Sequence, residues 1–268
     1  MDWEPNLDDY EGKIFTEPTI GGARRYHYNF ALECRKNFKW CCENSIRIVN
    51  KEGQRSFMKL NNAQNKLYEK CKEQLEKNNQ IRLVIIKGRQ QGISTFCRAM
   101  ILWKLCYYPQ TTALIVSQRE KDLREKAFRG LIDMYNLKLQ QMPASHQTST
   151  QLKIDHGRSG YSICFGEWAA TEGQSRGDRY DMVHLTEVDY YPDWIKFWGG
   201  LSQSIPTGNR SMVLIESTSA GRKALWEMYQ QSLSKDSPFE HVFIPWFDQE
   251  EYRLTAPKDF EPNDKEKS

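Results

Sequence analysis

The chain has 268 residues, of which 39% are hydrophobic and 27% are charged, and its formal net charge is +3. This composition is typical of a globular protein with a buried core, and so small a charge does not by itself indicate a polyanionic partner. No apolar run approaches the roughly 20 residues that cross a bilayer, and the acidic start, MDWEPNLDDYEG, does not predict a secretory signal peptide. We therefore expect no membrane partner.

Seven cysteines and five histidines are spread along the chain. The cysteines form no CxxC pair, and their odd number indicates reduced thiols in a cytosolic compartment. No histidine stands at zinc-ligand spacing from a cysteine pair, so a zinc site is not expected.

The N-terminal part is predicted to hold an arm followed by helices. Residues 1–30 are polar, with Gly and Pro, and indicate an irregular or docking arm. Residues 28–51 mix apolar and basic residues at helical spacing. Asn61 or Asn62 is expected to cap a helix that runs from about Ala63 to Lys77.

From residue 81 the pattern alternates between apolar strands and helices. The expected strands are IRLVIIK (81–87), TTALIVSQ (111–118), YSICFGEW (161–168), DMVHLTEV (181–188), RSMVLIEST (210–218) and a late edge strand, FEHVFIPWF (239–247). The expected helices are STFCRAMILWKLCYYP (94–109), REKDLREKAFRGLIDMYN (119–136) and ALWEMYQQSLSK (224–235). Such alternation predicts right-handed βαβ units around a mainly parallel sheet.

The first of these strands leads into KGRQQGIST (87–95), a turn that begins a helix. A Walker A loop has the form [G/A]xxxxGK[ST] at such a place; its backbone N–H groups surround a phosphate and the helix start adds a positive dipole. With Gly92 aligned to the second glycine, the usual lysine position holds Ile93, but Lys87 stands at the first position. A lysine side chain is long enough to reach back over the loop to the β- and γ-phosphates. The alternative is an ordinary strand–helix turn with basic surface residues.

A second strand ends in a carboxylate, in the segment DMVHLTEVDYY (181–191). A Walker B strand ends in Asp-Glu, where the Asp orients the magnesium shell and the Glu polarises the attacking water. Here Glu187 is in place, but the Asp position holds Thr186, whose hydroxyl is a weaker partner for a magnesium-bound water. The alternative is an edge strand followed by a solvated acidic turn.

Two further features are weaker. The strand in VLIESTSAG (213–221) ends in Ser217, Thr218 and Ser219, hydroxyl residues that can sense a γ-phosphate by hydrogen bonds, although Ser/Thr-rich strand ends are common. Gln64, some 17 residues before the loop strand, can read adenine through its amide, and the alternative is a surface glutamine at a helix start.

With these pieces in order, the sequence resembles the ATPase domain of the large terminase subunit of tailed phages, the DNA-packaging motor. The resemblance rests on LNNAQ, KGRQQGIST, SRGDRYDMVHLTEVDYYPDW and ESTSAG, and it covers roughly residues 55–235. It implies a P-loop NTPase of the additional-strand (RecA/ASCE-like) type, with a mainly parallel central sheet flanked by helices and a small terminal lid or linker subdomain. The expected divisions are an N-terminal arm and helical subdomain (1–55), an ATPase core (56–235) and a C-terminal linker or lid (236–268), without the nuclease domain of full terminases.

The resemblance also implies roles for individual residues. The predicted catalytic residues are Glu187, Lys87 and Arg89, the last as an arginine finger from the same chain. The predicted ATP-binding residues are Gln64, Lys87, Gly88, Arg89, Gln90, Gln91, Gly92, Ile93, Ser94 and Thr95. Ser94 and Thr186 are expected to hold Mg²⁺, partly through water, and Ser217, Thr218 and Ser219 to couple hydrolysis to movement. Arg119, Arg124 and Arg129 are candidates for an arginine supplied to a neighbouring subunit.

The implied cofactors are ATP and Mg²⁺. The implied partners are double-stranded DNA, the small terminase subunit and further copies of this chain in a ring, expected as a pentamer on the portal. The implied location is the host cell cytoplasm, with transient attachment to the procapsid.

Two other functions remain open on the sequence. A helicase-like DNA-dependent ATPase shares the adenine-reading glutamine, Walker A loop and Ser/Thr motif, but predicts a second RecA-like domain of about 150 further residues. A degenerate P-loop module that only binds DNA or supports structure would explain the displaced lysine and the missing Asp, whereas Lys87 and Glu187 oppose it.

Overall fold

The computed structural model describes residues 30–139, 144–169, 179–208, 210–248 and 252. The predicted N-terminal arm and most of the predicted C-terminal tail lie outside these residues. Within them, no helix is long and apolar enough to cross a membrane.

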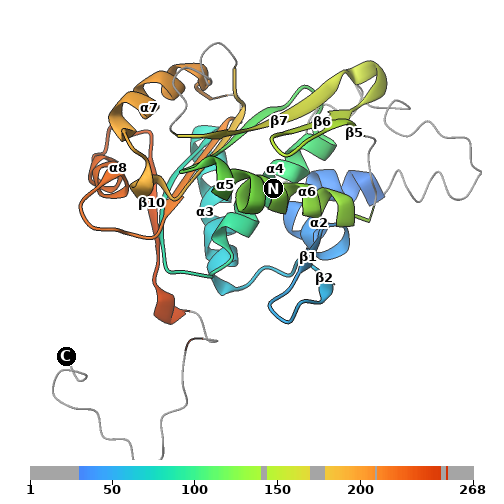
Figure 1. Cartoon of the computed structure of the whole chain (residues 1–268), viewed down its shortest axis with the longest axis horizontal. Coiled ribbons are helices and arrows are strands. Elements are labelled where there is room, and N and C mark those ends of the chain that lie inside the picture. The colour runs from blue at the N-terminus through green and yellow to red at the C-terminus, as the bar shows by residue number, and fades with distance from the viewer. Residues whose placement is uncertain (1–29, 140–143, 170–178, 209, 249–251, 253–268) are drawn as a thin grey trace, which may run out of the picture.

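An eight-stranded sheet forms the centre of the molecule, in the order β10-β3-β9-β8-β4-β7-β6-β5 (Figure 1). The strands are β3 (Ile81–Lys87), β4 (Thr112–Ser117), β5 (Ala144–Gln147), β6 (Gln151–Asp155), β7 (Tyr161–Trp168), β8 (Met182–Thr186), β9 (Met212–Ser217) and β10 (Glu240–Ile244). Strands β10 to β7 pair in parallel, and β7, β6 and β5 pair antiparallel. Because β9 lies between the loop strand β3 and β8, the sheet has the additional strand that was predicted.

Helices cover both faces of the sheet (Figure 1). They are α2 (Phe38–Asn44), α3 (Asn62–Asn78), α4 (Ile93–Tyr107), α5 (Glu120–Asp122), α6 (Phe128–Leu137), α7 (Trp194–Leu201) and α8 (Ala224–Ser232), with a π-helical turn at Leu123–Ala127 between α5 and α6. A small hairpin of β1 (Arg47–Val49) and β2 (Arg55–Phe57) precedes α3.

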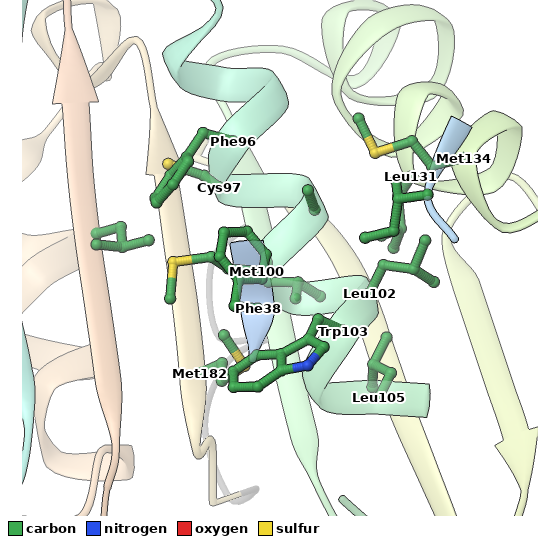
Figure 2. Close-up of a cluster of buried hydrophobic side chains, with 14 of the residues drawn as sticks. Phe38, Phe96, Cys97, Met100, Leu102, Trp103, Leu105, Leu131, Met134 and Met182 are labelled. Carbon is green, nitrogen blue, oxygen red and sulfur yellow. The ribbon is translucent and has the colours of Figure 1, made fainter. Parts of the chain in front are cut away.

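Each face of the sheet packs against its own hydrophobic core. On one face α4 is buried nearly all round, as expected of a helix that is apolar on every side. Phe38 of α2 packs edge-on against Phe96 and Trp103 of α4, at ring-centroid distances of 5.4 and 5.5 Å (Figure 2). On the other face α7 and α8 cover alternate residues of the same strands, such as Val84 and Val213. The loop between β3 and α4 is therefore supported by the larger of the two cores, into which α4 packs.

The expected elements of the core sheet are present, and the differences lie at its margins. Asn61 caps α3 with a full capping box, in which the Asn61 and Gln64 side chains bond each other's backbone N–H groups. Residues 28–51, predicted as helical, also contain β1. The antiparallel strands β5 and β6 were not predicted. The predicted division at residue 235 leaves out β10, which pairs with β3 along its whole length, so the core sheet extends to Ile244.

Candidate nucleotide site

A cleft of about 880 Å³ opens where the carboxyl ends of β3, β4 and β8 meet the start of α4. Ligands of open α/β sheets bind at this edge. Of the residues predicted from the sequence to form the site, the cleft is lined by Lys87, Arg89, Gln90, Ser94, Thr186, Glu187 and Thr218.

The loop between β3 and α4 depends on two left-handed backbone conformations. Gln90 has φ = 56° and Gly92 has φ = 75°. A Cβ on Gly92 would lie 2.7 Å from Nε2 of Gln64, so the Gln64 amide would have to shift to admit a side chain. Glycine at this position therefore avoids backbone strain and leaves the Gln64 amide in its place.

Some of the predicted ATP-binding side chains face the protein instead of the cleft. Gln91 is buried; its side-chain oxygen accepts from Gly88 N and its amide donates to the carbonyl of Pro245, just after β10. Ile93, the first residue of α4, is buried in the core, and Thr95 accepts a hydrogen bond from Arg98. At Gln91 and Ile93, only the backbone remains to serve a phosphate.

The side chain of Gln64 also hydrogen-bonds to the loop. It is buried, its oxygen accepts from Asn61 N, and its Nε2 donates to the carbonyl of Gly92 at 2.8 Å. Asn61 adds a bond from its own amide to the carbonyl of Gln91. The predicted contact of Gln64 with adenine stays a prediction; what this pair does here is hold the back of the loop.

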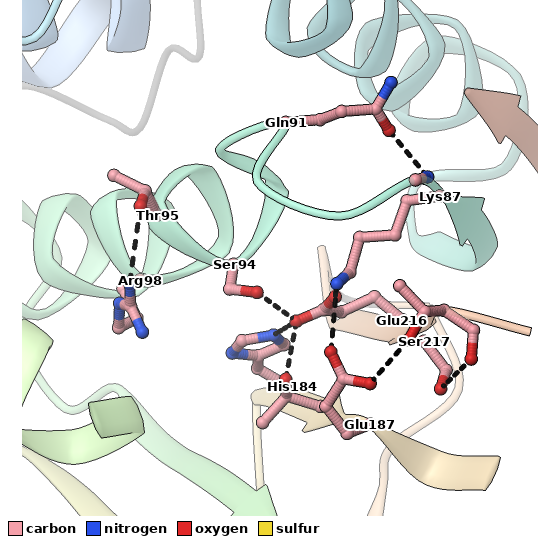
Figure 3. Close-up of polar contacts among 12 residues, drawn as sticks. Lys87, Gln91, Ser94, Thr95, Arg98, His184, Glu187, Glu216 and Ser217 are labelled. Carbon is pink, nitrogen blue, oxygen red and sulfur yellow. Dashed lines mark hydrogen bonds and ion pairs between the residues drawn. The ribbon is translucent and has the colours of Figure 1, made fainter. Parts of the chain in front are cut away.

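Lys87 lies at the centre of the site, between two carboxylates (Figure 3). Its Nζ is 3.0 Å from Oε1 of Glu187 and 3.0 Å from Oε2 of Glu216. Burial alone would lower the pKa of Lys87, but the two carboxylates outweigh it and raise the pKa above its ordinary value. The lysine is therefore charged and ready to pair with anions.

Glu216 was not assigned a role from the sequence, yet it has the most contacts in the site (Figure 3). It is wholly buried on β9, and its Oε1 accepts hydrogen bonds from Ser94 Oγ at 2.5 Å and Thr186 Oγ1 at 2.6 Å. Nε2 of His184 lies 3.2 Å from the same oxygen. Burial would raise the pKa of this carboxyl, but Lys87 and the hydrogen bond from His184 hold it well below its usual range. Glu216 is thus an anion without contact with solvent.

Glu187 follows β8 directly and has the left-handed φ of 58°, which is uncommon for a residue with a side chain. Its backbone N–H donates to the carbonyl of Glu216, and its Oε2 accepts from Thr218 Oγ1 at 3.1 Å. Nearby, Asp189 accepts from the backbone N–H groups of Ala220 and Leu225. The turn after β8 is therefore tied to the segment after β9.

The three predicted coupling residues differ in their surroundings. Thr218 lines the cleft and contacts Glu187. Ser217 is buried, and its hydroxyl donates to the carbonyl of Thr218. Ser219 is exposed. Of the three, only Thr218 contacts a predicted catalytic side chain among the described residues.

Cations line much of the cleft wall. Besides Lys87 and Arg89 the lining includes Arg98, Arg119 and Lys126, whereas Arg124 and Arg129 are not part of it. Asp122 accepts from Arg119 and Lys126. Arg98 was missed from the sequence; its position one turn after Ser94 on α4 is the signal that points to it. Such a wall suits a polyanionic ligand.

The oxygen donors fit a hard cation. Ser94, Thr186 and Glu216 bring two hydroxyls and a carboxylate together, and Mg²⁺ prefers oxygen ligands. Within the described residues no three His, Cys, Asp or Glu side chains are grouped to hold a metal by themselves. Mg²⁺ in phosphate-transfer sites keeps several waters and takes only one or two carboxylates, together with substrate phosphates, so this donor set suffices.

Comparisons with known proteins agree on the architecture. No protein-family model matches the chain. Its structure is similar to the HK97 bacteriophage large terminase, with a TM-score of 0.60 and 14% identity over 84% of this chain and 44% of that one. The chain has the fold of a large terminase ATPase domain. Within that fold, β3 and β8 carry the loop and the Glu187 turn.

Two further terminases share this fold. The large terminase of a thermophilic bacteriophage, in complex with ATP-gamma-S, matches with a TM-score of 0.56 and 10% identity, over 72% of this chain and 47% of that one. A point mutant of the Thermus phage P74-26 large terminase ATPase domain matches with a TM-score of 0.51 and 15% identity, over 68% of this chain and 80% of that one. The matched part is thus less than half the length of the HK97 protein and of the terminase bound to ATP-gamma-S.

Proposed function

We propose that this chain is the ATP-hydrolysing motor domain of a large terminase, which drives double-stranded DNA into a procapsid. One observation carries the proposal: Lys87 and Ser94 of the loop meet Glu187 at the cleft, although Glu187 comes from a segment about 100 residues further along the chain. A degenerate module has no need of a charged lysine paired with a carboxylate at the end of its strand.

Each residue of the site has its own role in ATP hydrolysis. Lys87 and the N–H groups of the loop bind the β- and γ-phosphates, for which Lys87 leaves its two carboxylates. Glu187, once released, orients the attacking water and accepts its proton. When bound, Mg²⁺ would neutralise charge on the phosphate oxygens, and Ser94 is the loop hydroxyl that would hold it. Arg89 and Arg98 face the same cleft and are available for charge that develops on the transferred group.

The contacts after β9 supply a route from hydrolysis to movement. Thr218 bonds the same carboxylate that pairs with Lys87, so a change at Glu187 reaches the segment that leads to α8. Asp189 ties that segment to the turn after β8. The proposed partners are double-stranded DNA, the small terminase subunit, the portal and further copies of this chain in a ring. The proposed location is the host cytoplasm.

The decisive experiment compares nucleotide binding with steady-state hydrolysis for the wild type, Lys87→Ala and Glu187→Gln, all with Mg²⁺. We expect Lys87→Ala to lose binding or turnover, and Glu187→Gln to bind ATP while turnover falls about 10²- to 10⁴-fold. Glu240→Gln, on the edge strand β10 and paired with Lys70, is the matched control and should behave as the wild type. A wild-type chain that neither binds nor hydrolyses ATP would reject the proposal in favour of a structural module.

A further inference from the structure

The hydrolysis steps proposed above give the buried carboxylate of Glu216 no part. Burying a charge is costly unless it is paired and hydrogen-bonded, so a wholly buried glutamate calls for an explanation. Its simplest role is that of counter-ion to Lys87. That role is already filled, because Lys87 lies at the same distance from Glu187.

The charges at this point do not balance. Two carboxylates share one ammonium, and within the described residues Lys87 is the only Lys or Arg within ion-pair distance of either; His184, beside Glu216, adds a positive charge only when it is protonated. The surplus negative charge is next to two hydroxyls, those of Ser94 and Thr186. Such a group of oxygens favours a further cation.

The strand register explains how Glu216 comes to lie there. Thr186 on β8 and Glu216 on β9 are register partners in a parallel pair. Side chains of such partners point to the same face of the sheet, here the face covered by α4. A carboxylate on β9 can therefore reach the place in front of Thr186, the position where a Walker B strand carries its Asp.

We propose that Glu216 supplies the carboxylate of the magnesium shell, in place of the Walker B Asp that Thr186 replaces. The carboxylate has moved across one strand of the sheet, while Ser94 and Thr186 keep their places as hydroxyl partners. Lys87 pairs with both Glu216 and Glu187 in this structure. Pairing of Lys87 with phosphate oxygens instead would free Glu216 to hold the metal. This inference rests on the proposed nucleotide-binding function.

The test measures metal affinity directly, without turnover. Mn²⁺ serves as the probe, and its affinity for the protein–ADP complex is followed by the loss of the free-ion EPR signal. We expect Glu216→Gln to weaken Mn²⁺ binding about 10- to 100-fold, with ADP affinity in EDTA changed less than about twofold. Glu240→Gln should match the wild type in both measurements.

A second variant places the carboxylate back on β8. We expect Thr186→Asp/Glu216→Gln to recover at least half of the lost Mn²⁺ binding free energy, because the Asp faces the same hydroxyl. Circular dichroism and urea unfolding establish that each variant is folded before binding is compared.

The outcomes separate the two proposals. If the wild type binds no nucleotide with or without Mn²⁺, the proposed function itself fails. If the wild type binds Mn²⁺–ADP and Glu216→Gln binds Mn²⁺ equally well, only the role of Glu216 is overturned. An equal loss of ADP affinity with Mn²⁺ and in EDTA would likewise overturn it, because Glu216 would then act only by holding Lys87. If the double variant is folded but does not recover Mn²⁺ binding, the idea that Glu216 on β9 takes the place of an Asp on β8 is rejected.

Discussion

Two buried cations lie five residues apart on β3 and have opposite surroundings. Among the described residues Arg82, near the start of the strand, donates only to neutral acceptors: the carbonyls of Ile81, Ser211 and Pro206 and the Ser211 hydroxyl. Lys87, at the end of the strand, contacts two carboxylates. Burial lowers the pKa of Arg82 to about 10, whereas Glu216 and Glu187 raise that of Lys87 against the effect of burial.

The difference separates a structural cation from one that can change partners. Four hydrogen bonds to fixed neutral groups satisfy Arg82, and no ligand anion is needed to complete its surroundings. The carboxylates around Lys87 can instead be exchanged for phosphates, because the lysine keeps its charge in either setting. The end of β3 at the cleft is therefore suited to binding, and the opposite end to holding the sheet together.

Among the variants that test this comparison, the largest effect is expected from removing the exchangeable cation. Lys87→Met keeps most of the side-chain volume but cannot pair with phosphate. We expect hydrolysis of ATP to fall about 10²- to 10³-fold, the usual cost of losing one preorganised donor to a developing charge. Steady-state phosphate release measures it, and a variant within threefold of the wild type would contradict the role of Lys87.

Arg82→Met should instead lower the stability of the fold and leave ATP hydrolysis unchanged. It removes four hydrogen bonds from a buried place, although the carbonyl of Ser211 keeps the Ile81 N–H as a donor and that of Pro206 keeps the Ser211 hydroxyl. We expect the free energy of unfolding to fall by about 3 kcal/mol, with hydrolysis per folded molecule unchanged. Urea denaturation gives the first quantity; a loss below about 1 kcal/mol would show that the arginine is dispensable for the sheet.

Gly92, in the loop, can be compared with Gly53, which lies outside the site. Gly92 and Gly53 have nearly the same left-handed φ, 75° and 77°, but only Gly92 would bring a Cβ against Gln64. We expect Gly53→Ala to cost about 1 kcal/mol of unfolding free energy and Gly92→Ala about 2 kcal/mol, because the clash adds to the backbone strain. Nucleotide affinity should drop for Gly92→Ala alone. Equal losses in the pair would mean that Gln64 moves away freely.

A third buried cation gives the smallest effect and depends on pH. Burial lowers the pKa of Lys104, on α4, to about 7. Since the unfolded chain keeps this proton up to about pH 10, the folded state binds fewer protons and stability rises as the pH increases above 7. Between pH 7 and 8.5 we expect a gain of about 1–2 kcal/mol in the wild type relative to Lys104→Met. Identical pH profiles for the two proteins would show that Lys104 does not titrate in this range.

Local patterns in the sequence were sufficient for the fold class and part of the site. Apolar runs and helix starts predicted β3, α4, β4, β8 and β9, because the periodicity and capping that define such elements are local. The spacing around residue 87 also predicted a phosphate loop with its lysine at the first position, and the end of β8 predicted a carboxylate. Lys87, Ser94 and Glu187 do line one cleft.

Only the tertiary structure decided how distant segments meet. Glu216 lies 30 residues from Thr186, and its place depends on the register of two strands that the sequence does not encode locally. Gln64 and Gln91 carry polar groups suited to a ligand, yet the packing of α3 and the segment after β10 turns both toward the loop itself. The sequence determined which side chains were available for the chemistry, and the pairing of strands determined which of them share a site.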